Sequence, residues 1–239
     1  EILEYVNIPK KSHKDRSHLP YTEKIFIYGA PFSHAVLIDL EIIKHFPEYQ
    51  VAYYVDDDPS IQGKVVYGID VLSWKEFEKK QKKENINKFF ISIGNMVYRR
   101  EKFRICIESG MEPINLIHPS AEISSYAEIK SNVLIKRGAI IGPGTLIGDG
   151  CIIDNGVTVS HDCSIDSFCH LAPGVSLGSD VTIKTFSVIS VGASISTGVT
   201  IGESVIVATG SAILQNVENQ IVMSGNPANI TGKSNIPRP

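Results

Sequence analysis

The sequence predicts two parts: an α/β domain with a small parallel sheet over residues 24–117, and an all-β parallel β-helix over residues 118–230. Strands alternate with amphipathic helices in the first part, which is typical of a parallel sheet. A six-residue pattern repeats without a break through the second part, which is typical of stacked short strands. We expect residues 1–23, which show no periodicity, to form a tail or linker, and residues 231–239 to form a C-terminal tail.

Composition and charge exclude several classes of function. The net charge is −3 and the basic residues are scattered, so nothing predicts a nucleic-acid partner. There is no run of about 18 apolar residues and no apolar signal-peptide core, so we expect no membrane span and a cytoplasmic location. The chain begins at Glu1, and we expect a segment of a longer protein, with a fusion to a membrane enzyme as one alternative.

Short apolar runs and helical spacings alternate through the first part. We expect strands at 24–29, 51–55 and 89–94, and helices from Ser33, near 73–83 and at 97–110. Ligands of such sheets bind beyond the carboxyl ends of the strands. The three turns that follow the strands are therefore the candidate nucleotide site, and they contain Phe32, Ser33, His34, Asp56, Asp57 and Gly94.

Each of these turns has a plainer interpretation. A glycine after a strand is often only a turn residue, and a run of Asp often caps a helix. A dinucleotide fingerprint needs three glycines, and the turn after the first strand supplies only Gly29. An NAD-dependent oxidoreductase is therefore disfavoured.

From Ala121 the chain divides into 16 consecutive hexads with Ile, Leu or Val at the third position and a small residue at the first. Three hexads make one 18-residue coil, and a spacing of about 4.8 Å gives a prism about 25 Å tall. Cys151, Cys163 and Cys169 occupy first positions, so we expect them in the core. The cysteine spacing predicts no metal site.

His161 stands at the fifth position of its hexad, an outward corner of the prism. Residues 18 apart stack, so the corner columns are Pro143, His161, Ser179 and Thr197, and Pro173, Val191 and Thr209. An exposed imidazole beside the carboxylate of Asp162 has the composition of a general base with an orienting partner. The alternative is two polar residues that merely occupy a turn.

The hexads, the SHDC stretch at 160–163 with His170 nine residues after His161, and the VMSGNPANI segment at 222–230 carry a resemblance. Together with the small α/β domain, they resemble the hexapeptide-repeat nucleotide-sugar acetyltransferases of the bacillosamine type, a group that includes sialic acid O-acetyltransferases. The resemblance implies a Rossmann-like domain, a left-handed prism and a trimer. It also implies acetyl-CoA as co-substrate and, as acceptor, a nucleotide-linked amino sugar such as a UDP-linked 4-amino-4,6-dideoxy sugar.

The resemblance also implies roles for single residues. His161 would deprotonate the acceptor amine, Asp162 would raise its basicity, and His170 would contact acetyl-CoA, with Val191 and Thr209 along a corner that suits the pantetheine arm. On the sugar side, Phe32, Ser33 and His34 stand where relatives have Ser-Gly-His, with Ser33 in place of the glycine. Asp56 and Asp57 would read the base, and Gly94 would end the third strand.

His161 and His170 are half a coil apart and cannot share one column of one prism. If both serve one site, the site must lie between two chains, so we expect a homotrimer. Two alternatives stay open: O-acetylation of a sialic acid hydroxyl, and a non-catalytic trimeric scaffold.

Overall fold

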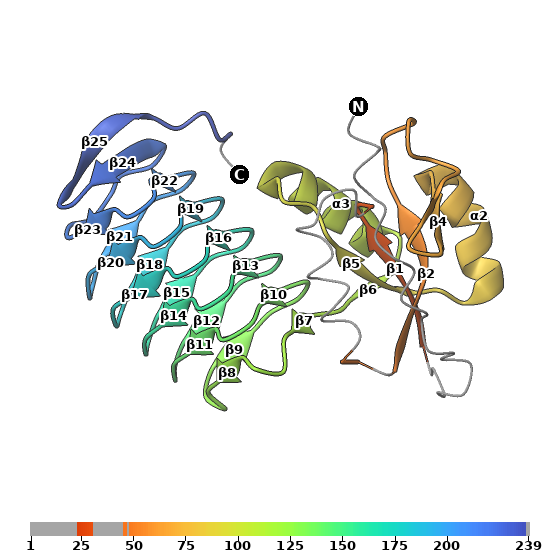
Figure 1. Cartoon of the computed structure of the whole chain (residues 1–239), viewed down its shortest axis with the longest axis horizontal. Coiled ribbons are helices and arrows are strands. Elements are labelled where there is room, and N and C mark those ends of the chain that lie inside the picture. Colours follow the sequence, from red (N-terminus) through yellow and green to blue (C-terminus); the bar gives the residue numbers. More distant parts are fainter. Residues whose placement is uncertain (1–22, 31–44, 47, 238–239) are drawn as a thin grey trace.

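The computed structural model describes residues 23–30, 45–46 and 48–237, which form an α/β domain beside a prism of stacked strands (Figure 1). The predicted helix from Ser33 falls at 31–44, outside the described residues. No helix among the described residues is both long and apolar enough to cross a membrane.

The α/β domain contains a six-stranded sheet with the order β3-β4-β2-β1-β5-β6. Strands β1, β2, β4, β5 and β6 pair in parallel, as predicted for the central strands. The strands are β1 (Glu23–Tyr28), β2 (Tyr49–Val55), β3 (Val65–Val66), β4 (Ile69–Leu72), β5 (Lys88–Ile91) and β6 (Glu112–Pro113).

One edge of this sheet adds an antiparallel hairpin to the predicted parallel sheet. Strands β3 and β4 form an antiparallel hairpin around Tyr67 and Gly68, both with positive φ (50° and 81°). A two-residue turn with two left-handed residues is favoured in hairpins because its twist matches that of the strands. The two residues of β3 are too few to show a period, so the sequence pattern does not predict this hairpin.

Two helices among the described residues flank the sheet, and polar side chains fix where each begins. Helix α2 (Trp74–Glu84) starts with a capping box between Ser73 and Glu76. Helix α3 (Met96–Glu108) starts at Asn95, whose Oδ1 accepts hydrogen bonds from the next backbone N–H groups. Both helices lie where the sequence predicts them, and Figure 1 shows α3 next to the prism.

The prism has three flat faces, each a parallel ladder of two-residue strands. Every hexad supplies one strand from its second and third positions, and partners lie 18 residues apart, as in Ile152 with His170. The first face contains β7 (Leu116–Ile117), β10 (Leu134–Ile135), β13 (Ile152–Ile153), β16 (His170–Leu171), β19 (Val188–Ile189), β22 (Ile206–Val207) and β24 (Ile221–Gly225), with β25 (Ala228–Lys233) antiparallel at its end.

The other two faces follow in chain order, and the sixteen strands β8 to β23 coincide with the sixteen predicted hexads. These stacked parallel sheets are typical of the left-handed β-helix. The second face contains β8 (Glu122–Ile123), β11 (Ile140–Ile141), β14 (Thr158–Val159), β17 (Ser176–Leu177), β20 (Ser194–Ile195) and β23 (Ala212–Ile213). The third face contains β9 (Glu128–Ile129), β12 (Leu146–Ile147), β15 (Ser164–Ile165), β18 (Thr182–Ile183) and β21 (Thr200–Ile201).

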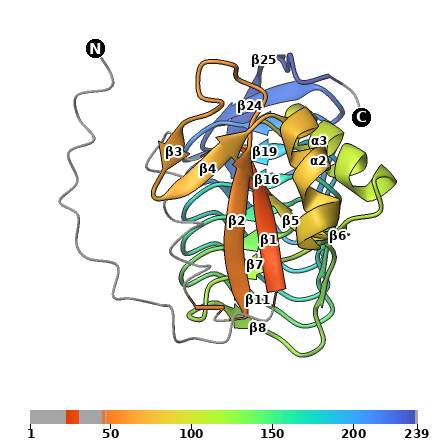
Figure 2. The same ribbon diagram turned by 90° about the vertical axis from the view of Figure 1, so that its right-hand side faces the viewer.

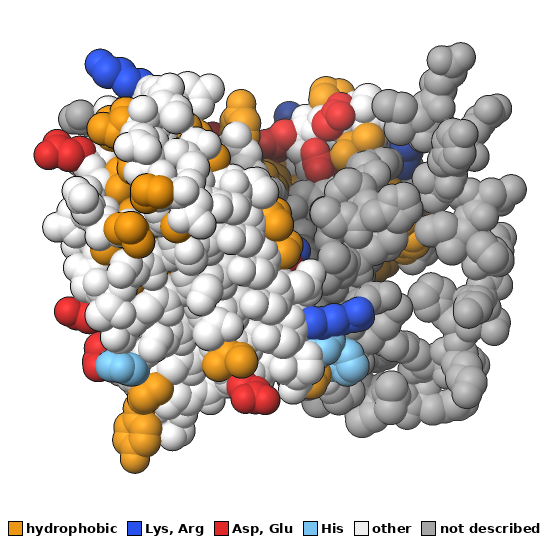
Figure 3. Space-filling model, turned by 60° about the vertical axis from the view of Figure 1, so that its left-hand side comes forward, with side chains coloured by type: hydrophobic (Ala, Val, Ile, Leu, Met, Phe, Trp, Pro, Cys, Tyr) orange, Lys and Arg blue, Asp and Glu red, His pale blue; other side chains and the backbone are white. Residues whose placement is uncertain are grey.

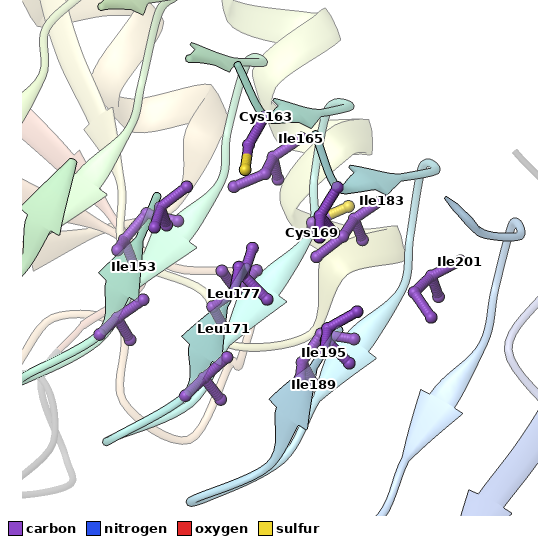
Figure 4. Close-up of a cluster of buried hydrophobic side chains, with 14 of the residues drawn as sticks. Ile153, Cys163, Ile165, Cys169, Leu171, Leu177, Ile183, Ile189, Ile195 and Ile201 are labelled. Atoms are coloured by element: carbon purple, nitrogen blue, oxygen red, sulfur yellow. The ribbon is translucent and has the colours of Figure 1, made fainter. Parts of the chain in front are cut away.

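The prism core is a stack of aliphatic side chains from the third position of each hexad (Figure 4). Burying one such side chain stabilises the fold by about 1.5–3 kcal/mol. The cysteines at first positions are buried and free, as predicted. Their thiols donate to backbone carbonyls of the next coil; for example, Cys163 Sγ donates to Gly178 O at 3.2 Å.

The C-terminal segment closes the top of the prism. The last coil is two residues shorter than the others, because Ile201 bridges to Val217. Residues 231–233, expected in a tail, complete β25. The segment after them also returns to the prism, since Ser234 N donates to Gln220 O and Ser204 Oγ to Pro237 O.

The α/β domain lies on the first face and on the corner that precedes it (Figure 2). Leu116, Leu134 and Ile152 of the first face extend the apolar cluster around Ile25 and Phe90. At the corner between the third and first faces, two left-handed phenylalanines meet α3. These are Phe168 and Phe186, which pack against Met96, Val97 and Phe103.

Candidate functional site

The corner between the second and third faces carries an exposed histidine and carboxylate pair. His161 Nδ1 lies 2.8 Å from Asp162 Oδ2, and the two side chains are 57% and 69% exposed. Asp162 has a φ of 57°, a left-handed conformation that Asp adopts more readily than most residues. A ring that donates from Nδ1 to a carboxylate leaves Nε2 with a free lone pair, which suits a general base.

The predicted corner column is confirmed by backbone hydrogen bonds between coils. Asp162 N donates to Pro143 O at 2.9 Å, Asp180 N to His161 O at 3.1 Å, and Gly198 N to Ser179 O at 2.9 Å. The pair is therefore fixed from the coil below and the coil above.

A cavity of about 170 Å³ lies between the α/β domain and the first face of the prism. One wall is the segment that follows β5, including Ser92 and Gly94. The other wall includes His170 on β16. This is the end of the sheet at which ligands of parallel α/β folds bind. The structure thus brings together two of the predicted residues, Gly94 and His170.

A nearly buried carboxylate lies close to His170 in this cavity, although His170 Nε2 has no hydrogen-bond partner. Asp154 Oδ2 lies 3.6 Å from His170 Nε2 and 3.5 Å from Lys136 Nζ, and the side chains of Lys136 and Asp154 are nearly buried. Burial opposes ionisation of Asp154, but contacts with His170, the backbone N–H of Asn155 and Lys136 hold its pKa below the usual value.

Two further polar side chains line the cavity with unused donors. Arg99 and Asn132 are each 1% exposed, and Arg99 Nη2 and Asn132 Nδ2 have no hydrogen-bond partner. The remaining Arg99 nitrogens donate to the carbonyls of Gly150, Ile93 and Gly94 at 2.7–2.8 Å. Unsatisfied buried donors are costly, so this wall is suited to receive an oxygen-rich ligand.

The two predicted base-reading carboxylates are engaged within the chain. Asp56 accepts hydrogen bonds from the N–H groups of Ala30 at 2.8 Å and Asp58 at 2.9 Å. Asp57 accepts from the hydroxyl of Tyr28 at 2.8 Å and pairs with Lys102 at 2.6 Å. In this structure both carboxylates order the turns beyond β1 and β2. Phe32, Ser33 and His34 lie outside the described residues.

Val191 and Thr209 are exposed on the corner between the first and second faces. Gly210 N donates to Val191 O at 2.9 Å, so the two residues stack as predicted. This corner follows the face that bears His170.

Within one chain, the structure does not bring His161 and His170 together. In a triangular prism, the corner between the second and third faces is opposite the first face, and His170 lies on the first face. A site that uses both side chains therefore requires a second chain.

The four cavity residues with charged or amide side chains other than His170 were not predicted: Arg99, Asn132, Lys136 and Asp154. For two of them the sequence contains a signal, because Lys136 and Asp154 are 18 residues apart at an outward position and must stack. The described residues contain no group of three or more His, Cys, Asp or Glu side chains that could hold a metal ion.

Comparisons with known proteins agree with this architecture. Residues 24–105 match the model of the PglD N-terminal domain, and residues 126–161 match the model of the bacterial transferase hexapeptide (six repeats). No curated protein sequence was found to match the chain.

Among solved structures, the chain is similar to a histidine-to-alanine variant of GDP-perosamine N-acetyltransferase from Caulobacter crescentus in complex with CoA and GDP-perosamine. The identity is 28% and the TM-score 0.81, over 88% of this chain and 97% of that one. It is also similar to the acetyltransferase domain of PglB from Neisseria gonorrhoeae in complex with acetyl coenzyme A, with 27% identity and a TM-score of 0.79, over 87% and 99%. WeeI from Acinetobacter baumannii, at 24% identity and a TM-score of 0.72 over 87% and 100%, shares the fold.

The architecture and these relatives lead to one conclusion. The chain contains a region that matches the PglD N-terminal domain and a region that matches bacterial transferase hexapeptide repeats, and it is similar over most of its length to sugar N-acetyltransferases solved with CoA or acetyl coenzyme A.

Proposed function

We propose that the protein transfers an acetyl group from acetyl-CoA to the amino group of a nucleotide-linked amino sugar. The observation that carries the proposal is the exposed pair of His161 and Asp162 on the prism, with Nδ1 and Oδ2 2.8 Å apart. One relative described above was solved with CoA and GDP-perosamine, and another with acetyl coenzyme A. These ligands support both the proposed acetyl donor and the proposed class of acceptor.

The mechanism is direct transfer in a ternary complex. The sugar nitrogen attacks the thioester carbonyl carbon while Nε2 of His161 accepts a proton from that nitrogen. The tetrahedral intermediate then expels the thiolate of CoA, which takes the proton from the imidazolium. The amide, free CoA and neutral His161 remain, so no nucleophile of the protein is consumed.

The cavity beside His170 is the proposed site of the sugar and its phosphates. Arg99, Asn132 and Lys136 supply donors there, and the family resemblance adds the turns at Phe32–His34, Asp56, Asp57 and Gly94. The resemblance favours a UDP-linked 4-amino-4,6-dideoxy sugar, while a GDP-linked sugar is bound in one relative. Acetyl-CoA would contact His170 and lie along the corner of Val191 and Thr209.

The proposed active form is a homotrimer in which His161 of one chain faces the cavity of the next. The second and third faces support this packing because their outward side chains in the middle coils are small, such as Thr158, Ser176 and Ser164. Figure 3 shows that the forward surface of the prism carries few charged side chains.

The test of activity is a screen of UDP- and GDP-linked amino sugars with acetyl-CoA, read by mass spectrometry for the acetylated product. His161→Ala is expected to lower kcat by about 10²- to 10⁴-fold and to leave acetyl-CoA binding nearly unchanged. Full activity of this variant would contradict the proposal. Acetylation of sialic acid instead of amino sugars would favour O-acetylation, and no binding of acetyl-CoA would favour a scaffold.

The test of the shared site is complementation between inactive variants. His161→Ala and His170→Ala are unfolded together, refolded as a mixture and assayed. In randomly assembled trimers, about a quarter of the interfaces contain both an intact His161 and an intact His170. Activity should therefore return to about a quarter of the wild-type value. No return of activity in mixtures that do assemble would place both histidines in one chain's site.

A further inference from the structure

We propose that the GPGT stretch at 142–145, one coil below the pair of His161 and Asp162, is a positioning element that fixes the geometry of this pair. The geometry of the proposal comes from the structure. Its expected effect on kcat rests on the proposed function. Three of the four residues contribute: Gly142 and Gly144 because they have no side chain, and Thr145 through its hydroxyl.

The first contribution is space for the carboxylate. Gly144 lies directly below Asp162 with a φ of 70°, and a Cβ at this position would overlap Asp162 Oδ1 far inside van der Waals contact. The carboxylate therefore rests with Oδ1 over Gly144 and Oδ2 toward His161. An exposed ion pair contributes little when its side chains are free to move, and a side chain at 144 would displace the carboxylate from this position.

The second contribution is close approach of the backbone. A Cβ at Gly142 would lie 2.7 Å from the carbonyl of Ser160 and 2.9 Å from the N–H nitrogen of His161. Real Cβ atoms do not approach backbone atoms so closely, so any side chain at 142 would push the coil with His161 away. Gly142 thus sets the height of His161 above the coil below.

The third contribution is a buried hydroxyl that bonds to the backbone before and after the corner. Thr145 is 1% exposed, and its Oγ1 donates to Ser160 O at 2.9 Å and accepts from Cys163 N at 3.4 Å. These two groups flank the pair in sequence. The same hydroxyl therefore fixes the backbone on both sides of His161 and Asp162.

Gly144→Ala is the variant that tests this proposal, and Gly198→Ala is its matched control. Gly198 stands in the same corner column with a φ of 73°, so it carries the same backbone strain, but no atom lies near a Cβ built there. The readout in the ligand-free protein is the pair of imidazole ¹⁵N shifts of His161, assigned by their loss in His161→Ala. We expect the Nδ1–H tautomer in the wild type and in Gly198→Ala, and a mixture of tautomers in Gly144→Ala.

Kinetics give the second readout. Gly144→Ala should lower kcat about 10-fold or more, while the KM for acetyl-CoA stays near its wild-type value. In an Asp162→Ala background the same substitution should have no further effect on kcat, since it acts through Asp162. Additive losses, or equal losses in Gly198→Ala, would overturn the proposal. The tautomer measurement does not depend on activity, so failure of the proposed function would be recognised separately.

A second pair of variants covers the case in which Gly144→Ala does not fold. Thr145→Val removes the hydroxyl at nearly constant shape and should shift the tautomers of His161 in the same direction. Ser187→Ala is the control, because Ser187 has the same role at another corner, donating to Gly202 O at 2.6 Å and accepting from Val205 N at 3.1 Å. Unchanged ¹⁵N shifts in Thr145→Val would also overturn the proposal.

Discussion

Asp154 Oδ2 lies 3.6 Å from Nε2 of His170, across two neighbouring coils of the first face. The same oxygen lies 3.5 Å from Lys136 Nζ, so one nearly buried carboxylate lies close to two basic side chains. The arrangement places a negative charge beside His170 and Lys136 in the wall of the cavity.

The first prediction concerns stability at low pH. The pKa of Asp154 is lower in the folded protein than in the unfolded chain, because its contacts with His170, Asn155 and Lys136 outweigh burial, which acts in the opposite direction. Its stabilising contribution is therefore present above the unfolded value of about 4 and is lost as pH falls through the folded value. The difference in unfolding free energy between wild type and Asp154→Asn should shrink below about pH 4 in urea titrations. A constant difference from pH 3 to pH 7 would contradict this.

The second prediction concerns Asp162→Asn. Asn also tolerates the left-handed conformation, so the corner should keep its shape, while the orienting negative charge is lost. We expect kcat to fall about 10- to 100-fold, less than for His161→Ala. Asp180→Asn is the matched control, because Asp180 lies one coil above with the same φ of 57°. Equal kcat values for the two variants in steady-state assays would remove the role of Asp162.

The third prediction concerns the contact between α3 and the prism. Arg99 donates from Nε to Gly150 O and from Nη1 to two carbonyls after β5. A lysine cannot reproduce this planar fork, so Arg99→Lys should lower the free energy of unfolding by about 3 kcal/mol. Arg100→Lys, which keeps a cation over the ring of Phe186, should change it by less than about 0.5 kcal/mol. Thermal and urea unfolding would measure both, and equal stability of the two variants would refute the prediction.

The fourth prediction concerns the phenylalanine corner. Phe186 is 1% exposed and its ring centre lies 6.1 Å from that of Phe168. Phe186→Ala should cost about 3–5 kcal/mol because it opens a cavity between α3 and the prism. Hydrogen exchange should show earlier opening of α3 than of the prism strands. A cost below about 1 kcal/mol would mean that the helix is held elsewhere.

The prism could be predicted almost residue by residue because its period leaves no alternative. A side chain at the third position of every hexad must point inward if the coils are to stack, and one period places every corner. The same six-residue period places His161 and Asp162 at an outward corner. The α/β domain was predicted less fully, since β3 and β6, with two residues each, are too short to show a pattern.

The cavity could be predicted only in part. Gly94 and His170 were named, but Arg99 and Asn132 come from a helix and a corner that meet only when the two parts pack. Their signal is spatial, so one-dimensional spacing cannot reveal it. Lys136 and Asp154 are 18 residues apart, so the repeat predicts that they stack but not that they are buried.

The two ends of the prism differ in features that affect whether copies of the protein can stack end to end into a fibre. A stack of parallel strands presents open backbone groups at each end, where further copies could add by strand pairing. At the C-terminal end, the antiparallel hairpin of β24 and β25 ends the first face. At the other end, β8 and β9 carry exposed Glu122 and Glu128, and Lys130 pairs with Glu128. Charge near one end and a reversed strand at the end of the first face therefore disfavour end-to-end polymerisation through these described strands.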